Sequence, residues 1–162
     1  MTYFELLRAH QGYLERIAFA MLGNRADVED ALQETALAGY KAFDQLRGGE
    51  HAFGAWIRQI LIRKCGRILE GRRRVFPVDE PAAYLPGSLP GPDAESTALW
   101  EMVARLGDHL RPVVVLRYML DLPQTEIAEA LGIPLGTVKS RLGKALELLR
   151  AMEAAAERSD AL

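Results

Sequence analysis

Basic and hydroxyl side chains gather on one side of a predicted helix near the end of the chain. They are Thr137, Lys139, Ser140, Arg141 and Lys144. On a helical wheel they lie on the arc opposite Val138, with Arg141 at its edge. Val138 begins an apolar series that continues through Leu142, Ala145 and Leu149. Such donors suit phosphates and base edges in a DNA major groove. The pattern therefore favours binding of duplex DNA. The alternative is an ordinary helical hairpin with a solvated basic face.

A second short helix is predicted just before these donors, within residues 123–142. Ile127, Ala128 and Leu131 recur at helical spacing on one face, and Gly132 permits the positive φ that a sharp turn requires. The small side chain of Ala128 allows a second helix to cross closely over the first. Together the two segments have the outline of a helix-turn-helix.

A second basic group lies earlier, on a long helix predicted from about residue 53. Its apolar stripe is Phe53, Trp56, Ile57, Ile60, Leu61 and Ile68. Its positive charges are Arg58, Arg63, Lys64, Arg67, Arg72, Arg73 and Arg74, opposed by Glu70. This charge density favours a polyanionic partner. Phe53 and Trp56 strengthen a nucleic-acid interpretation, although either ring can be core and a basic helix end can be a solvated face.

A third candidate surface lies on the helix predicted over residues 27–43. The face opposite its buried side carries Asp30, Gln33, Glu34, Leu37 and Tyr40. An exposed Leu and Tyr among acids and an amide suit a protein docking surface. The alternative is a solvated face with two incidental apolar residues.

The composition of the 162 residues is that of a globular protein, with 49% hydrophobic and 26% charged residues. A net charge of −2 argues against nucleic-acid binding by the whole chain and leaves it to the local basic patches. A single Cys65 excludes an intramolecular disulfide, and the scattered histidines show no metal-ligand spacing. No catalytic cluster, membrane span or export signal is recognisable, so we expect a cytoplasmic protein without cofactor, metal or small-molecule substrate.

The predicted fold class is all-α, with two small helical domains. Residues 1–75 form the first, with helices over about 4–22, 27–43 and from 53 onward, and Gly23-Asn24 as the first helix stop. Residues 76–97 form an acidic Pro/Gly-rich linker that separates the two modules. Residues 98–152 form the second domain, with a helix over about 110–120 before the helix-turn-helix. Residues 153–162 are expected to be a frayed tail.

The layout of these modules resembles that of bacterial extracytoplasmic-function (ECF) RNA polymerase sigma factors. The resemblance is carried by Gly23 to Glu34, by Trp56 with Ile57 and Ile60, and by Glu126-Ile127-Ala128 through Gly136 to Leu142. It covers nearly the whole chain. It implies that the first domain corresponds to sigma region two and the second to region four, with no region three between them.

The resemblance also implies partners and roles. The docking surface would bind the clamp of core RNA polymerase, and the loop 44–52 with the basic helix would open and read the minus-ten promoter element. The helix-turn-helix donors would bind the minus-thirty-five element as duplex. An anti-sigma factor is a further implied partner, and polymerase rather than this chain would supply the bond chemistry, so the chain is not expected to be an enzyme.

The sequence departs from the family pattern at a few positions. Arg63 and Arg67 replace an expected Asn and acid, Gly107 replaces a Pro, and Pro134 stands where a Ser usually caps the recognition helix. The lost cap costs on the order of 1 kcal/mol, which a proline early in the helix would partly offset. Rival interpretations are a sigma-like decoy or anti-sigma-binding adaptor, and a free-standing helix-turn-helix repressor.

Overall fold

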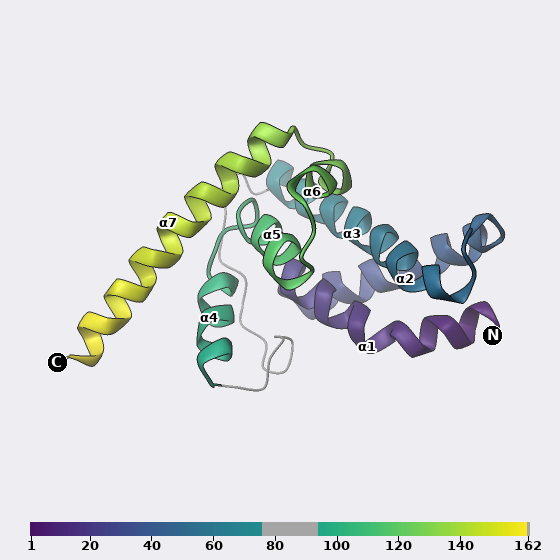
Figure 1. Ribbon diagram of the computed structural model, residues 1–162, viewed down its shortest axis with the longest axis horizontal. Coiled ribbons are helices and arrows are strands. Elements are labelled where there is room, and N and C mark those ends of the chain that lie inside the picture. Colours follow the sequence, from purple (N-terminus) through teal and green to yellow (C-terminus); the bar gives the residue numbers. More distant parts are fainter. Residues whose placement is uncertain (76–93, 162) are drawn as a thin grey trace.

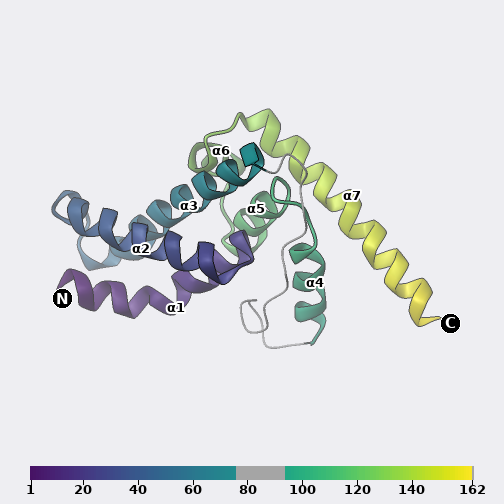
Figure 2. The same ribbon diagram turned by 180° about the vertical axis from the view of Figure 1, so that it is seen from behind.

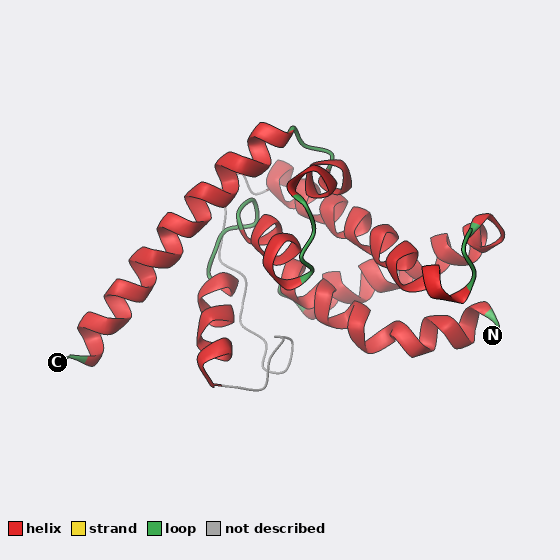
Figure 3. Cartoon of the chain, viewed as in Figure 1, coloured by secondary structure: helices red, strands yellow, loops and turns green. Residues whose placement is uncertain are grey.

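The computed structural model describes residues 1–75 and 94–161. Over these residues every regular element is helical, which confirms the predicted all-α class (Figure 3). The first module, residues 1–75, contains α1 (Tyr3–Leu22), α2 (Arg25–Ala42), the short 3₁₀ helix η1 (Phe43–Gln45) and α3 (Glu50–Val75). The second module, residues 94–161, contains α4 (Ala94–Ala104), α5 (Arg111–Val114), the π-helix η2 (Val115–Met119), α6 (Gln124–Leu131) and α7 (Leu135–Asp160).

Local side chains determine where α1 and α2 begin and end. Thr2 and Glu5 form a capping box at the start of α1. The helix ends at Gly23, whose φ of 77° is left-handed, as the sequence predicted. Asn24 then accepts a hydrogen bond from the Asp27 amide at 2.9 Å and caps α2. Two adjacent residues therefore end one helix and start the next.

The three long helices of the first module pack around one apolar centre (Figures 1 and 2). Tyr3 reaches across it and donates from its hydroxyl to the Ala36 carbonyl oxygen. Gly39 makes room for this ring, since a Cβ there would lie 2.5 Å from Tyr3 Oη and 2.7 Å from Ile57 Cδ1. Phe53 is completely buried and so belongs to the core, whereas Trp56 is partly buried beside it.

The two modules pack directly against each other, although the linker was expected to separate them. Buried apolar residues of both modules belong to a single core cluster. Helix α6 lies against α3, and α5 lies against the end of α1 (Figure 1). The packing is possible because these helices carry complementary apolar faces, a feature that the composition of a linker does not report.

Several predicted boundaries need correction. Most of the predicted 76–97 linker, residues 76–93, lies outside the described residues, but α4 already begins at Ala94. The single helix expected over 110–120 is instead a short α5, with Pro112 in its first turn, followed by a π-helix. The tail from residue 153 is not frayed, because α7 continues to Asp160. Its Ala, Glu and Arg residues favour helix even where they are exposed.

Candidate functional site

The helix-turn-helix is formed by α6 and the start of α7. Gly132 follows α6 with φ 68°, and the Ile133 amide donates back to the Ala128 carbonyl oxygen at 3.1 Å. This pattern is a Schellman turn, which ends α6 sharply before the second helix starts. Pro134 is the N-cap residue of α7, with ψ 149° and no side-chain cap. It therefore precedes the helix, and the partial compensation expected from a proline inside its first turn does not apply.

The five predicted donors lie at the beginning of α7. Lys139, Ser140 and Lys144 are exposed, while Thr137 and Arg141 are partly buried. Val138, Leu142 and Ala145 on the opposite side are buried against the module, as the wheel predicted. The apolar side therefore fixes the rotation of α7 and presents the three exposed donors outward.

The basic residues of α3 do not form one uniform face. Arg63 and Arg67 are exposed, whereas Arg58 and Lys64 are partly buried. Arg58 donates to the Tyr13 hydroxyl at 3.3 Å, which ties it to α1. Arg73 and Arg74 belong to the last turn of α3, but their side chains lie outside the described residues.

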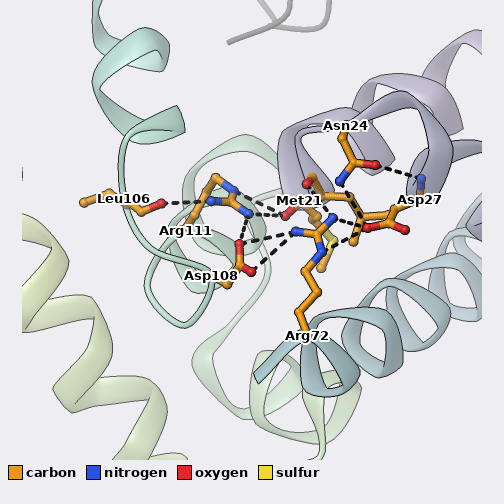
Figure 4. Close-up of polar contacts among 8 residues, drawn as sticks. Met21, Asn24, Asp27, Arg72, Leu106, Asp108 and Arg111 are labelled. Carbon is orange, nitrogen blue, oxygen red and sulfur yellow. Dashed lines mark hydrogen bonds and ion pairs between the residues drawn. The ribbon is translucent and has the colours of Figure 1, made fainter. Parts of the chain in front are cut away.

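Arg72 differs most from its predicted role, because it is engaged within the protein. Its guanidinium donates to the Leu22 carbonyl oxygen at 2.8 Å and to the Asp27 carboxylate at 2.5 and 2.9 Å (Figure 4). It also contacts the Asp108 carboxylate of the second module at 3.4 Å. Its side chain is only 21% exposed. In this arrangement Arg72 joins helices rather than presenting its charge to solvent.

A second arginine completes this contact from the other module. Arg111, 1% exposed, donates to the Met21 carbonyl oxygen at 2.9 and 3.2 Å, to the Leu106 carbonyl oxygen at 2.8 Å and to Asp108 at 2.7 Å (Figure 4). We call the set Met21, Leu22, Arg72, Asp108 and Arg111 the arginine cluster. Sequence reasoning missed its role and assigned Arg111 no function.

The arginine cluster also affects Asp27. Partial burial acts to raise the pKa of this carboxyl, but hydrogen bonds from Arg72 and Asn24 and the charge of Arg72 outweigh it, so the pKa is lowered from its ordinary value of 3.8. Asp27 is therefore held in its charged form beside the start of α2. It reinforces the side-chain cap that Asn24 provides there.

The predicted docking surface lies along one exposed side of α2. Asp30, Gln33, Glu34, Leu37 and Tyr40 are all exposed. Leu37 and Tyr40 have 56% and 58% of their surface open to solvent, and together they form an apolar patch on this helix face. The structure thus brings the five residues onto one continuous face of a helix.

Phe4 of α1 extends this surface and was not predicted to do so. Phe4 is 61% exposed and stacks on Tyr40 with ring centroids 5.6 Å apart. Beside it lies a groove between α1 and α2 lined by Leu7, Leu14, Leu32, Gln33 and Ala36. The spacing of Phe4 and Leu7 fits one helical face, so sequence periodicity gave no sign that Phe4 turns outward.

A cavity of about 230 Å³ lies between the modules. Gly66, Leu69 and Glu70 of α3 line one side, and Asp108, Leu131 and Arg141 are among the residues that line the other. A Cβ placed on Gly66 would lie 3.5 Å from Leu131 Cδ2, so α6 approaches α3 closely at this point. Arg141 therefore lies beside the basic helix of the first module.

The described residues include no metal centre, reactive thiol or membrane-spanning helix. Among those that the structure describes, no group of three His, Cys, Asp or Glu side chains could hold a metal ion. Burial raises the pKa of the Cys65 thiol to about 12, so it is protonated and unreactive at neutral pH. In residues 1–75 and 94–161, no helix is both long and apolar enough to cross a membrane.

Comparison with known proteins assigns both modules. Residues 6–75 match the family model Sigma-70 region 2, and residues 96–149 match Sigma-70, region 4. The chain is 30% identical over 155 residues to the RNA polymerase sigma-E factor of Streptomyces coelicolor, covering 93% of this chain and 85% of that protein. It is 28% identical over 141 residues to the RNA polymerase sigma factor SigV of Bacillus subtilis, covering 87% and 84%.

Solved structures show the same fold. The sigma factor RpoE from Bartonella quintana, in complex with the anti-sigma factor NepR, is similar with a TM-score of 0.60 and 21% identity, covering 94% of this chain and 96% of that one. CnrH in complex with the cytosolic domain of CnrY gives a TM-score of 0.57 and 24% identity, covering 94% and 88%. The arrangement of helices is therefore that of sigma factors.

The chain belongs to the sigma-70 family of RNA polymerase sigma factors and, within it, to the extracytoplasmic-function group. It is accordingly a promoter-specificity subunit of bacterial RNA polymerase that directs the initiation of transcription. Its partners are core RNA polymerase and promoter DNA.

Proposed function

We propose that the docking surface on α2 is the principal contact of this chain with core RNA polymerase. The single observation that carries the proposal is the exposure of Leu37 and Tyr40 among Asp30, Gln33 and Glu34 on one helix face. An apolar patch surrounded by charged residues is typical of a protein interface. Acidic groups at its edge suit a basic partner surface and would favour rapid association.

In the proposed function, each module binds a different promoter element. Arg63 and Arg67, exposed on α3, attract the backbone of the minus-ten element as its strands separate. Lys139, Ser140 and Lys144 contact the minus-thirty-five duplex, joined by Thr137 and Arg141 when these are accessible. Arg72 is assigned a structural role instead, because its donors are directed to Leu22, Asp27 and Asp108.

The chain performs no bond chemistry itself in this account and is not an enzyme. It works in the cytoplasm with polymerase and needs no cofactor or small-molecule substrate. An anti-sigma factor is proposed as a regulatory partner, since the two similar structures described above are sigma factors in complexes, one of them with a named anti-sigma factor.

Run-off transcription with purified core polymerase on a broad promoter pool tests the function. The wild type should give transcripts that core polymerase alone does not. The double variant Asp30→Lys/Glu34→Lys should lose polymerase binding while its circular dichroism stays helical. Wild-type protein that binds duplex DNA as a dimer but never supports a transcript would favour the repressor interpretation.

A matched control separates the docking surface from net charge. Glu153 and Glu157 are exposed on α7 with the same four-residue spacing. The variant Glu153→Lys/Glu157→Lys makes the same change in charge and should retain polymerase binding. Equal loss in both double variants would show that charge alone matters and would exclude a specific docking role for α2.

A further inference from the structure

The outward face of α7 carries little side-chain volume along its centre. Gly136, Ser140 and Gly143 follow one another at helical spacing, and all three are exposed. They lie opposite Val138 and Leu142, which are buried against the module. Between residues 136 and 143, Ser140 is therefore the one side chain at the centre of this face.

Cations lie along both edges of the same face. Helical spacing puts Lys139 on one side of Ser140 and Lys144 on the other, and both lysines are exposed. The ion pair of Lys144 with Glu147 is long, at 3.8 Å, and both of its side chains are more than half exposed, so it holds the ammonium group only weakly. Two lysines on either side of a narrow centre suit a helix that lies between the two phosphate backbones of a major groove.

Packing within the chain does not explain the two glycines. A Cβ placed on Gly136 or Gly143 would meet no atom within 4 Å, whereas Gly39 is required by the ring of Tyr3. A glycine inside a helix is less stable than an alanine there. Gly12 of α1 is equally open, so open space alone indicates no ligand. The difference is that Gly136 and Gly143 lie among the donors of the proposed DNA-binding helix.

The dimensions of DNA give the bare centre a consequence. A major groove is about 12 Å wide, and a helix with its side chains is about 10–12 Å in diameter. Side chains at the centre of the inserted face therefore decide how deep the helix can lie. Glycine lets the backbone come closest to a ligand. The short Ser140 side chain needs this closeness to reach a base edge, and its hydroxyl makes only a long bond of 3.5 Å to the Thr137 carbonyl oxygen.

We propose that Ser140 is the base-reading residue at the centre of α7, and that Gly136 and Gly143 are contact positions where the bare helix lies against the duplex. Lys139 and Lys144 bind phosphates on the two sides and fix the register. This inference rests on the proposed function, because it takes the start of α7 to enter the minus-thirty-five duplex. It goes further by separating the residue that discriminates bases from those that position the helix.

Added methyl groups test the contact positions. Gly136→Ala and Gly143→Ala should each raise the thermal midpoint of the free chain, because alanine favours helix. In complex with core polymerase, each should weaken binding to a promoter duplex about tenfold, within the usual effect of one misfitting methyl group. The slope of log K against log salt should stay as in the wild type, because no phosphate contact is removed. Gly12→Ala is the matched control, with a raised midpoint and wild-type affinity.

Selection from a duplex pool randomised over the minus-thirty-five element tests Ser140. Complexes of the wild-type chain with core polymerase should enrich preferred bases, each by about tenfold, as is usual for one specific base pair. Ser140→Ala should lose the preference at one base pair and keep the others. Ser159→Ala, exposed in the last turn of α7, is the control and should keep them all. A Ser140→Ala variant that retains every preference overturns the reading role.

The possible results separate this inference from the proposed function. Alanine variants that are more stable and bind the promoter duplex as tightly as the wild type show that the bare face does not touch DNA, and the inference is then wrong although transcription is normal. Lower affinity with a shallower salt slope also contradicts it, because a phosphate contact has then been lost instead. The proposed function fails when the wild-type chain itself gives no polymerase-dependent promoter binding, a result that does not involve the glycine variants.

Discussion

Arg111 and Arg72 donate to consecutive carbonyl oxygens, those of Met21 and Leu22, at the end of α1. The last carbonyls of a helix have no partner within it, and their dipoles favour positive charge. The last turn of α1 contains no basic residue of its own. Its cap is therefore supplied by two guanidinium groups from helices α3 and α5, and Asp108 holds both.

Replacement of Arg111 should lower the free energy of unfolding more than replacement of any surface arginine. In Arg111→Met, the carbonyl oxygens of Met21 and Leu106 lose a buried donor, and Asp108 loses the guanidinium that lies 2.7 Å away. Breaking such a buried group typically costs about 3 kcal/mol or more. Urea unfolding should show a lower midpoint. Arg117→Met, which breaks an exposed pair with Asp121, should change stability by about 0.5 kcal/mol at most. Similar losses in both would show that Arg111 is not structurally special.

Gly39 should not tolerate even a methyl group. In Gly39→Ala, the new Cβ would meet Tyr3 Oη and Ile57 Cδ1 below 3.0 Å, and Tyr3 cannot retreat without losing its bond to Ala36. The destabilisation caused by overpacking, about 1–3 kcal/mol, should exceed the stabilisation of about 1 kcal/mol that alanine's higher helix propensity provides. Thermal unfolding should show a lower midpoint.

Gly12→Ala is the matched substitution on α1, where nothing lies within 4 Å of the added methyl group. It should raise stability by roughly 1 kcal/mol, because only the propensity gain applies. The two alanine variants are thus expected to have opposite signs. A stabilised Gly39→Ala would mean that the Tyr3 ring packs differently.

Stability should depend on pH through Asp27. Its pKa is lower in the folded chain than the ordinary 3.8, so its ionised form stabilises the fold. That contribution is complete above about pH 4 and is lost as the pH falls through the lowered value. In Asp27→Asn, the acid limb of a stability-against-pH curve should be flatter below pH 4. The control Asp160→Asn changes a residue in the exposed last turn of α7 and should leave the acid limb of the curve as in the wild type. An unchanged acid limb in Asp27→Asn would contradict the stabilising role of ionised Asp27.

Lys144 should act on DNA through phosphate. Its ammonium group is exposed, and its ion pair with Glu147 is long, at 3.8 Å. In Lys144→Ala, duplex affinity should fall similarly for all sequences, and the slope of log K against log salt should become shallower by about 0.9. Fluorescence anisotropy at several salt concentrations measures this slope. Arg158→Ala, at the far end of α7, should leave the slope unchanged, and a change in base preference with Lys144→Ala would instead indicate base reading.

Local signals in the sequence were sufficient for much of the fold. Gly23 and Asn24 correctly marked a helix end, and Gly132 marked the turn between α6 and α7. Both predictions depend on backbone preferences of single residues. The buried positions Val138, Leu142 and Ala145 followed from a second local signal, the helical periodicity of apolar side chains.

Contacts between distant segments could not be predicted in this way. Arg72 counted as one more charge on a basic helix, and its partners Leu22 and Asp108 lie 50 and 36 residues away. The missing basic residue at the end of α1 was the one available signal, since those carbonyls needed a donor. It did not identify which arginine would supply it. The roles of the docking and DNA-binding residues stay predictions.

The bond from Arg111 to Met21 spans 90 residues, so it closes a long loop of the chain. During synthesis from the N-terminus, α1, α2 and α3 are complete before Arg111 has been made, so the end of α1 stays hydrated until the second module follows. The closing of this long loop then comes late. Its entropic cost grows only with the logarithm of loop length, by about 0.6 kcal/mol for each doubling. Evolution can therefore lengthen or shorten the intervening segment with little penalty, provided that Arg111 still reaches the first helix.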